Sequence, residues 1–381
     1  MTVKEIRVSR PYRICNRCIM DTTDPEIVFD AEGNCNHCTA ALERMRVQIL
    51  PPVERERALD ALTAKIREEG RGRDYDCIIG VSGGVDSTAV AYTVRQLGLR
   101  PLAVHFDNGW NTEIAVDNIR KTLDVLDIDL VTRVVDWEEF RDLQLCFLRA
   151  SVANCETPTD HGIFALLWRT ASRHGIRFIL TGSNIATEAI MPYAWGHYHQ
   201  DLLHLKALHR RFGKVPLQTL PTISLFHYFY YVFGKGIRQI PFLNYIPYDK
   251  AEAKAMLARE ICWRDYGGKH YESVWTRFFQ GYYLPTKFGF DKRKAHLSTM
   301  ICSGQITRRQ ALEEMKEPPY DPDLLRQDLQ FVTKKFGLTA GEFQKIIDAP
   351  PKEAREYPSH FFLFHRLVRY KNMFRKIATS A

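Results

Sequence analysis

The stretch GVSGGVDST, residues 80–88, decides the fold. It follows a short apolar run, DCIIGV (76–81), and leads into DSTAVAYTVRQLG (86–98), whose apolar residues have helical spacing. Two motifs fit the stretch. One is G-x-S-x-G, the nucleophile elbow of serine hydrolases, and the other is S-G-G-x-D-S, a loop that binds phosphates. The two interpretations assign different chemistry to Ser82.

The phosphate-binding interpretation accounts for more of the loop. Gly83 and Gly84 let backbone N–H groups turn toward an anion without a Cβ in the way. Ser82 and Ser87 add hydroxyl donors, and the helix that starts near Asp86 points its positive end at the anion. Asp86 would order the loop or bind Mg²⁺. The hydrolase elbow explains neither Asp86 nor Ser87 and needs a later Asp and His as well. We therefore expect a phosphate loop.

Strands and helices alternate after this loop. We expect further strands at 99–110, 129–136 and 176–184, with helices at 111–127, capped by Asn111 or Thr112, and at 163–175. This order predicts an α/β fold with a parallel sheet. Ligands of such sheets bind outside the carboxyl ends of the strands. The turns FDNG, with Asp107 and Asn108, and TGSN, with Gly182 and Ser183, lie at those ends together with the loop.

Four of the nine cysteines form two C-x-x-C pairs near the N-terminus. Residues 19–34 separate the pair Cys15 and Cys18 from the pair Cys35 and Cys38, which lies within the spacing window of tetrahedral zinc sites. Four thiolates close the coordination sphere, so the sequence predicts a structural zinc ribbon. His37 is an alternative fourth ligand. The other cysteines have no metal spacing and are expected in the core.

Changes in composition along the chain suggest four regions. We expect the zinc ribbon over 1–45, a charged helical linker over 46–72, the phosphate-loop domain over 73–200, and a mainly helical region over 201–381 that completes the active site. EIVFD (26–30) reads as a short strand. Helices are expected at 251–261, at 308–315 and across 320–347. ISLFHYFYYVF (223–233) is expected as a buried helix, with a surface-docking helix as the alternative.

The net charge and the cysteine content limit the kinds of partner and the cellular compartment that we expect. The net charge of +8 favours an anionic substrate or partner, but does not choose among nucleotides, nucleotide sugars, RNA and headgroups. The N-terminus shows no secretory signal, and no apolar run is long enough to span a bilayer. The odd cysteine count and the C-x-x-C pairs favour a reducing compartment. We expect a cytoplasmic protein without a transmembrane segment.

SGGVDS resembles the PP-loop of the ATP pyrophosphatases, and it is not a Walker A loop because no G-K-[ST] follows. Enzymes of this superfamily adenylate an oxygen, release pyrophosphate and let a nitrogen or sulfur nucleophile displace AMP. The resemblance implies that Asp107, Asn108, Gly182 and Ser183 lie near ATP, which would bind together with Mg²⁺.

The chain as a whole resembles the N-acetyl sugar amidotransferase family of bacterial surface-polysaccharide pathways. The resemblance rests on the following blocks, which occur in the family's order: YRICNRCIMDTTDPEIVFDAEGNCNHC (12–38), GVSGGVDST, IPFLNYIPYDK (240–250), WRDYGGKHYESVWTRFFQ (263–280) and LPTKFGFDKRKAHLS (284–298). It implies that ATP activates the oxygen of a sugar N-acetamido group and that ammonia then gives an acetamidino group. It also implies separate glutaminase and cyclase-like barrel subunits that supply ammonia, a nucleotide-linked or lipid-linked diacetamido sugar, and a place in O-antigen biosynthesis.

Basic residues in the second half become candidates for stabilising the leaving pyrophosphate. Lys269 and Arg277 are preferred, because the neighbouring Gly267 and Gly268 permit close backbone approach. Asp160 and His161 are candidates for orienting the acetamido group or ammonia, and Glu188 is a further candidate metal ligand. The other basic residues considered, with solvated surface charge as the alternative for each, are His270, Lys287, Lys292, Arg293 and Lys294. YAWGHYH (193–199) either stacks a ligand or packs.

Two other functions compete with this interpretation. The zinc ribbon and the basic, aromatic tail FFLFHRLVRYKNMFRK (361–376) would also suit a tRNA-modifying PP-loop enzyme. A thiolating enzyme would need a pair of catalytic cysteines, whereas Cys155 has no partner nearby in the sequence, and we expect no nucleic-acid partner. A non-catalytic zinc-ribbon scaffold would not need an intact SGGVDS loop.

Overall fold

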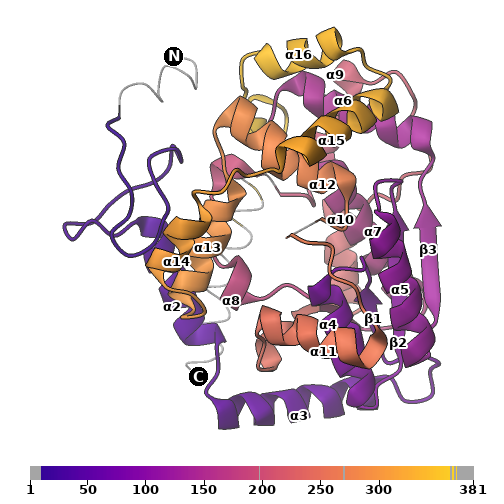
Figure 1. The fold of residues 1–381 in the computed structure, drawn as a ribbon. Coiled ribbons are helices and arrows are strands. Elements are labelled where there is room, and N and C mark those ends of the chain that lie inside the picture. The colour runs from indigo at the N-terminus through magenta and orange to yellow at the C-terminus, as the bar shows by residue number, and fades with distance from the viewer. Residues whose placement is uncertain (1–9, 197, 269–270, 361–362, 364–365, 367–381) are drawn as a thin grey trace.

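The computed structural model describes residues 10–196, 198–268, 271–360, 363 and 366. It contains a five-stranded parallel sheet, which lies toward the right of the view in Figure 1. The strand order is β3-β2-β1-β4-β5. Register pairs Ile78 of β1 with Leu102 of β2 on one side and with Ile179 of β4 on the other. The strands are β1 Cys77–Gly80, β2 Pro101–Asp107, β3 Leu130–Val134, β4 Phe178–Thr181 and β5 Arg238–Pro241. The predicted α/β fold with a parallel sheet is confirmed.

Helices cover both faces of the sheet because successive strand residues point to opposite sides. Ile79 packs with α4 (Val85–Gln96), α5 (Glu113–Leu126) and α11 (Lys250–Ile261). Ile78 packs on the other face with α7 (Thr157–Arg173). A parallel sheet covered on both faces explains why its central strands read as continuous apolar runs.

Helix ends follow local capping signals. The Thr112 hydroxyl accepts a hydrogen bond from the Ala115 N–H, so Thr112 and not Asn111 caps α5. The Asp136 carboxylate accepts from the Glu139 N–H and caps α6, Trp137–Ala150, a helix that the sequence analysis did not predict. Because α5 and α6 begin beyond the carboxyl ends of β2 and β3, these caps fix the loops at the edge of the sheet where ligands are expected.

The N-terminal region consists of the cysteine turns followed by two helices, α2 (Asn36–Gln48) and α3 (Pro52–Glu69), where a single helical linker was expected. The break falls at Pro51 and Pro52, because proline favours the first turn of a helix and not its interior. The prediction of a strand over 26–30 is wrong. Only Phe29 forms a bridge, to Cys35.

The region after β4 is mainly helical, as predicted, and packs around an aromatic core. Trp275, Phe278 and Phe279 are fully buried at its centre. Helix α13 packs against α2, α8 and α14, which joins this region to the cysteine turns. The remaining elements are α8 Ile185–Glu188, η1 Tyr193–Trp195, α9 Leu202–Phe212, α10 Leu225–Phe229, η2 Tyr230–Gly234, η3 Phe242–Tyr245, α12 Val274–Phe278, η4 Phe279–Phe288, α13 Lys292–Cys302, α14 Arg308–Glu314, α15 Pro322–Phe336, α16 Ala340–Asp348 and η5 Ala354–Glu356.

Two expectations for this region need correction. Strand β5 lies within it and extends the sheet beside β4, although no strand was expected after residue 184. The segment 223–233 is helical but not buried. Phe226 and Phe233 are 78% and 75% exposed, and Tyr228 is partly buried against Trp168. A run of aromatic residues does not show by itself which side faces the core. In the described part of the chain, no helix combines the length and the apolar character that crossing a bilayer requires.

The aromatic core predicts a contrast between two phenylalanines. Replacing Phe278, which is fully buried, with alanine leaves a cavity and should lower the free energy of unfolding by about 3–5 kcal/mol. Phe226→Ala removes the same side chain from an exposed site and should change it by less than about 0.5 kcal/mol. Urea unfolding followed by tryptophan fluorescence measures both. Equal losses in the two variants would contradict this description of the core.

Candidate active site

The loop between β1 and α4 is a tight turn closed by its own hydroxyl groups. The Ser82 and Ser87 Oγ atoms lie 3.2 Å apart, and Ser82 Oγ accepts from the Gly84 N–H at 3.3 Å. The Ser87 hydroxyl donates to the Gly84 carbonyl at 3.0 Å. Gly83 has φ +76, and a Cβ at this position would lie 2.3 Å from the Ala115 carbonyl oxygen. The turn therefore requires glycine both for its backbone conformation and for its close approach to α5.

Residues far away in the sequence hold this loop in place. The Gly83 carbonyl accepts hydrogen bonds from Trp263 Nε1–H at 3.0 Å and from Asn118 Nδ2–H at 3.3 Å. The Val85 N–H donates to the Tyr266 hydroxyl at 3.3 Å. Segment 263–266, which follows α11, thus fixes both the turn and the start of α4.

Asp86 faces a second tyrosine. The Tyr248 hydroxyl donates to the Asp86 carboxylate, and burial together with that negative charge raises the pKa of Tyr248. Tyr248 therefore stays protonated and acts as a hydrogen-bond donor. This contact orders Asp86, one of the two roles that the sequence suggested for it.

A cavity of about 180 Å³ lies at the loop. Hydroxyl groups and the positive end of α4 line it, a combination that suits an anion. The carboxylates at the same place suit a Mg²⁺ ion that would accompany phosphates. Its lining residues are Ser82, Gly84, Asp86, Ser87, Gly182, Ser183, Glu188, Tyr266 and Glu272. In the described part of the chain, the hydrogen-bond partners of Ser82 Oγ are Ser87 and Gly84 and include no histidine, so the geometry favours a phosphate loop over a hydrolase nucleophile.

A larger cavity of about 990 Å³ adjoins the first one. The residues shared by both linings are Ser82, Gly182, Ser183, Glu188 and Glu272. The large cavity reaches between the carboxyl edge of the sheet and helices α7, α12 and α13. Its volume exceeds what a phosphate group needs, so a second substrate has room beside a bound nucleotide.

The two predicted turns at the edge of the sheet both contribute. Gly182 and Ser183 line both cavities. Asn108 lines the large cavity, and its Nδ2–H donates to Thr159 Oγ1 at 3.1 Å. The Asp107 carboxylate accepts from the Gly109 N–H at 2.9 Å and from Asn111 Nδ2–H at 3.4 Å, which makes it a support of the turn.

The predicted residues of α7 occupy different environments. Asp160 lines the large cavity. His161 is buried, and both ring nitrogens bond to the main chain: Nδ1 to the His199 carbonyl at 2.6 Å, and Nε2 to the Ile223 N–H at 3.2 Å. Burial lowers the pKa of His161 to about 4, so the ring is neutral, with Nδ1 as the donor. With both nitrogens occupied, His161 positions the chain around the cavity.

Arg277 lines the large cavity, but it is already paired. Its guanidinium donates to both oxygens of Asp328 at 2.6 and 2.8 Å, and the Tyr320 hydroxyl donates to the same carboxylate. This buried fork fixes α12 to α15. The other preferred cation, Lys269, and its neighbour His270 lie outside the described residues.

Three other basic residues of the second half have structural partners. Lys287 donates to carbonyls at the end of α16, including that of Ala349 at 2.6 Å. Lys294 binds Asp21 at 2.5 Å, and Arg293 pairs with Asp291 at 2.7 Å while also lining the large cavity.

Sequence reasoning missed Glu156 and Glu272, and it gave Lys292 no preference over its neighbours. All three line the large cavity. Burial, followed by the charge of Asp160, raises the pKa of Glu156 to about 8. Burial lowers the pKa of Lys292, which the nearby Glu156 and Asp160 partly offset. No spacing rule links these residues in the sequence, although Glu156 is the neighbour of Cys155, which was considered above as a catalytic cysteine.

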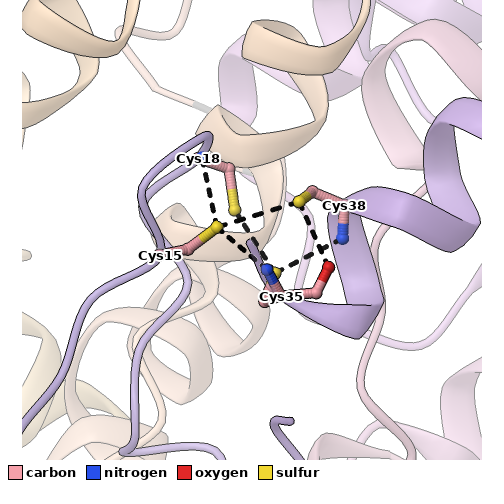
Figure 2. Close-up of side chains that lie close together, drawn as sticks. All are labelled: Cys15, Cys18, Cys35 and Cys38. Atoms are coloured by element: carbon pink, nitrogen blue, oxygen red, sulfur yellow. Dashed lines mark hydrogen bonds between the residues drawn. The ribbon is translucent and has the colours of Figure 1, made fainter. Parts of the chain in front are cut away.

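The four predicted zinc ligands come together in a buried cluster (Figure 2). The sulfur atoms of Cys15 and Cys38 lie 3.8 Å apart, and those of Cys18 and Cys35 lie 3.6 Å apart. A tetrahedral zinc ion with bonds of ~2.3 Å would place its sulfur ligands about 3.8 Å apart, so the cluster fits the ion. His37 Nε2 instead contacts Asp24 at 2.5 Å.

Comparison with known proteins gives one family match. Residues 272–372 match the family described as "LPS biosynthesis protein WbpG-like, C-terminal domain", so this segment is similar to that domain. The match confirms the resemblance to surface-polysaccharide proteins for this part of the chain. It includes Glu272, Arg277 and Lys292 of the large cavity. No curated protein matches the chain.

Two solved structures are among those similar to the chain, at low sequence identity. A predicted subunit of tRNA methyltransferase from Methanocaldococcus jannaschii is 13% identical, with 48% of this chain and 75% of that chain covered and a TM-score of 0.28. The NMN synthetase from Francisella tularensis is 12% identical, with 55% of this chain and 96% of that chain covered and a TM-score of 0.29.

The loop geometry predicts that Gly83→Ala abolishes nucleotide binding. The added methyl group would collide with the Ala115 carbonyl and displace the turn. Gly72→Ala is the matched control, because Gly72 has a similar φ of +75 with open space around it. Both variants bear the strain of a left-handed alanine, about 1–2 kcal/mol, but only Gly83→Ala should lose ATP affinity in calorimetry. Normal ATP affinity in Gly83→Ala would contradict the assignment of the loop.

The cysteine cluster predicts about one zinc ion per chain by elemental analysis. Cys35→Ser should lose the metal and lower the melting temperature, because the cluster packs in the same core as α13. The expectation that Cys262 lies in the core is wrong, because its side chain is exposed. Cys262→Ser therefore changes a thiol outside the cluster and should retain the metal. Full zinc content in Cys35→Ser would exclude this cluster as the site.

Proposed function

We propose that this chain is an ATP-dependent amidotransferase that converts a sugar N-acetamido group into an acetamidino group during bacterial surface-polysaccharide synthesis. One observation carries the proposal: the phosphate cavity at the loop and the large cavity share a wall. An α-phosphate at the loop would thus face a substrate oxygen in the large cavity. The WbpG-like domain at residues 272–372 supports the polysaccharide pathway.

The loop residues would hold ATP. The N–H groups at the start of α4 and the hydroxyl groups of Ser82 and Ser87 would bind the phosphates. Asp86, oriented by Tyr248, is our candidate for holding Mg²⁺, which neutralises phosphate charge. Positioning both substrates across the shared wall supplies the proximity that the first step needs.

The chemistry consists of two displacements. In the first, the acetamido oxygen attacks the α-phosphorus, pyrophosphate leaves, and the amide nitrogen loses its proton, which gives an O-adenylyl imidate. In the second, ammonia attacks the imidate carbon, and AMP leaves with the original oxygen. An amide oxygen is a poor leaving group, so the adenylation makes the exchange possible. We propose that separate glutaminase and barrel subunits deliver the ammonia, and that the sugar is a diacetamido sugar on a nucleotide or lipid carrier.

The test is a reaction of the full chain with a UDP-linked 2,3-diacetamido sugar, ATP, Mg²⁺ and ammonium chloride, followed by mass spectrometry. We expect AMP and pyrophosphate, and a sugar product in which NH replaces oxygen. Asp86→Asn should lower the rate of AMP formation by about 10²–10³-fold if this carboxylate orders the charged site. Asp124→Asn, at an exposed site on α5, should leave the rate unchanged.

Other outcomes would point to other functions. AMP release that requires added tRNA, with no reaction of the sugar, would replace this proposal with a tRNA-modifying enzyme. ADP as the product would contradict adenylation. A lipid-linked sugar as the only reacting substrate would keep the chemistry and change the carrier.

A further inference from the structure

Glu156, at the N-terminal end of α7, carries a buried carboxyl oxygen that has no hydrogen-bond partner in the described part of the chain. Its Oε2 accepts a hydrogen bond from the Thr276 hydroxyl at 3.0 Å. Its Oε1 exposes less than 1 Å² and has no hydrogen-bond partner among the described residues. A buried acceptor without a donor destabilises the fold, and more so when it is charged. Because Glu156 lines the large cavity, a ligand there that donates an N–H would remove this destabilisation.

The charged groups that face Glu156 indicate the charge of the ligand that would bind beside it. Asp160 lies one turn further along α7, Glu272 comes from the segment before α12, and Lys292 comes from the start of α13. These are three carboxyl groups, counting Glu156, and one ammonium group. Lys292 Nζ has no hydrogen bond or ion pair within the described part of the chain, and it lies 5.8 Å from the centre of the Phe279 ring. Carboxyl groups outnumber the ammonium group at this end of the cavity, which favours a small cation as the ligand there.

The protonation behaviour of Glu156 agrees with a role in proton transfer. Burial, followed by the charge of Asp160, raises its pKa to about 8, while Lys292 opposes the shift. A carboxyl group whose pKa lies close to the working pH exchanges protons efficiently, unlike an ordinary glutamate, which is a weak base at neutral pH.

We propose that Glu156 binds ammonium in the large cavity and accepts its proton, so that ammonia is released beside the activated sugar. The proposal rests on the proposed function and names the group that prepares its nucleophile. Mg²⁺ fits this place less well than ammonium, because it prefers six ligands in octahedral geometry and keeps several bound waters. Glu156 offers a single buried oxygen atom, and the positively charged Lys292 lies nearby.

The step balances without another reactant. Ammonium transfers a proton to the Glu156 carboxylate, which gives ammonia and a neutral carboxyl group. The nitrogen lone pair forms a bond to the imidate carbon, and the bond from that carbon to the AMP oxygen breaks. The product amidinium keeps all three hydrogens of ammonia and one positive charge, and AMP takes the corresponding negative charge. Glu156 then returns its proton to solvent.

Glu156→Gln tests the step with two nucleophiles. Pyrophosphate release with ATP and the UDP-linked diacetamido sugar reports adenylation, and product formation reports the second displacement. Hydroxylamine is neutral near pH 7.5 and needs no deprotonation before it attacks. We expect Glu156→Gln to lose about 10²-fold or more of the ammonium-dependent product while product from hydroxylamine changes by less than about threefold. Glu138→Gln, at an exposed site on α6, is the matched control and should resemble the unmodified chain with both nucleophiles.

The pH profile gives a second readout. Glu156 is protonated below its pKa of about 8 and accepts no proton there. The ammonium-dependent rate of the unmodified chain should rise with pH and flatten above about 8. The rate of Glu156→Gln should continue to rise above that pH, because it depends on free ammonia in solution.

The outcomes separate the two proposals. Absence of pyrophosphate release from the unmodified chain with any diacetamido sugar would remove the proposed function and this step with it. Adenylation with an unchanged ammonium-dependent rate in Glu156→Gln would overturn only the step. Equal losses with ammonium and hydroxylamine, or rescue by excess Mg²⁺, would assign Glu156 to structure or to metal binding and overturn it as well.

Discussion

The carbonyl oxygen of Gly83 is the point on which the site depends. It accepts hydrogen bonds from Trp263 at 3.0 Å and Asn118 at 3.3 Å, so one atom joins the loop to α5 and to the segment after α11. The positive φ of Gly83 makes this possible, because it brings the loop into contact with the Ala115 carbonyl. The loop alone provides the donors for phosphate, and the later segments set its orientation toward the large cavity. The site therefore needs both halves of the chain: the first half supplies the loop, and the second half supplies the segment that holds the loop in place.

Features that depend on local sequence could be predicted. The loop combines two glycines and flanking hydroxyl groups within a few residues, and the cysteine turns require pairs at fixed spacing, so both are visible in the sequence. The central strands were predicted because each is an apolar run bounded by turns. Thr112 was among the expected caps because capping depends on the next three residues.

Features that depend on long-range packing could not be predicted. Tyr248, which follows the edge strand β5, lies far from Asp86 in the sequence, and nothing in its own segment indicates their contact. Arg277 looked like a cation for phosphate, but its fork with Asp328 becomes visible only when α12 and α15 are placed together. The segment 223–233 was misjudged because helical aromatic residues can face a core or solvent with the same spacing. Glu156 and Lys292 meet only in the folded chain.

The central claim is that the loop and the segment after α11 form one nucleotide site. Hydrogen–deuterium exchange with an ATP analogue whose α,β bond cannot be cleaved tests it directly. The account predicts that the analogue protects residues 82–87 and 263–266 together, because ligand binding at the loop stabilises both sides of the Gly83 contacts. Protection confined to the cysteine turns, or protection of 82–87 without 263–266, would contradict it.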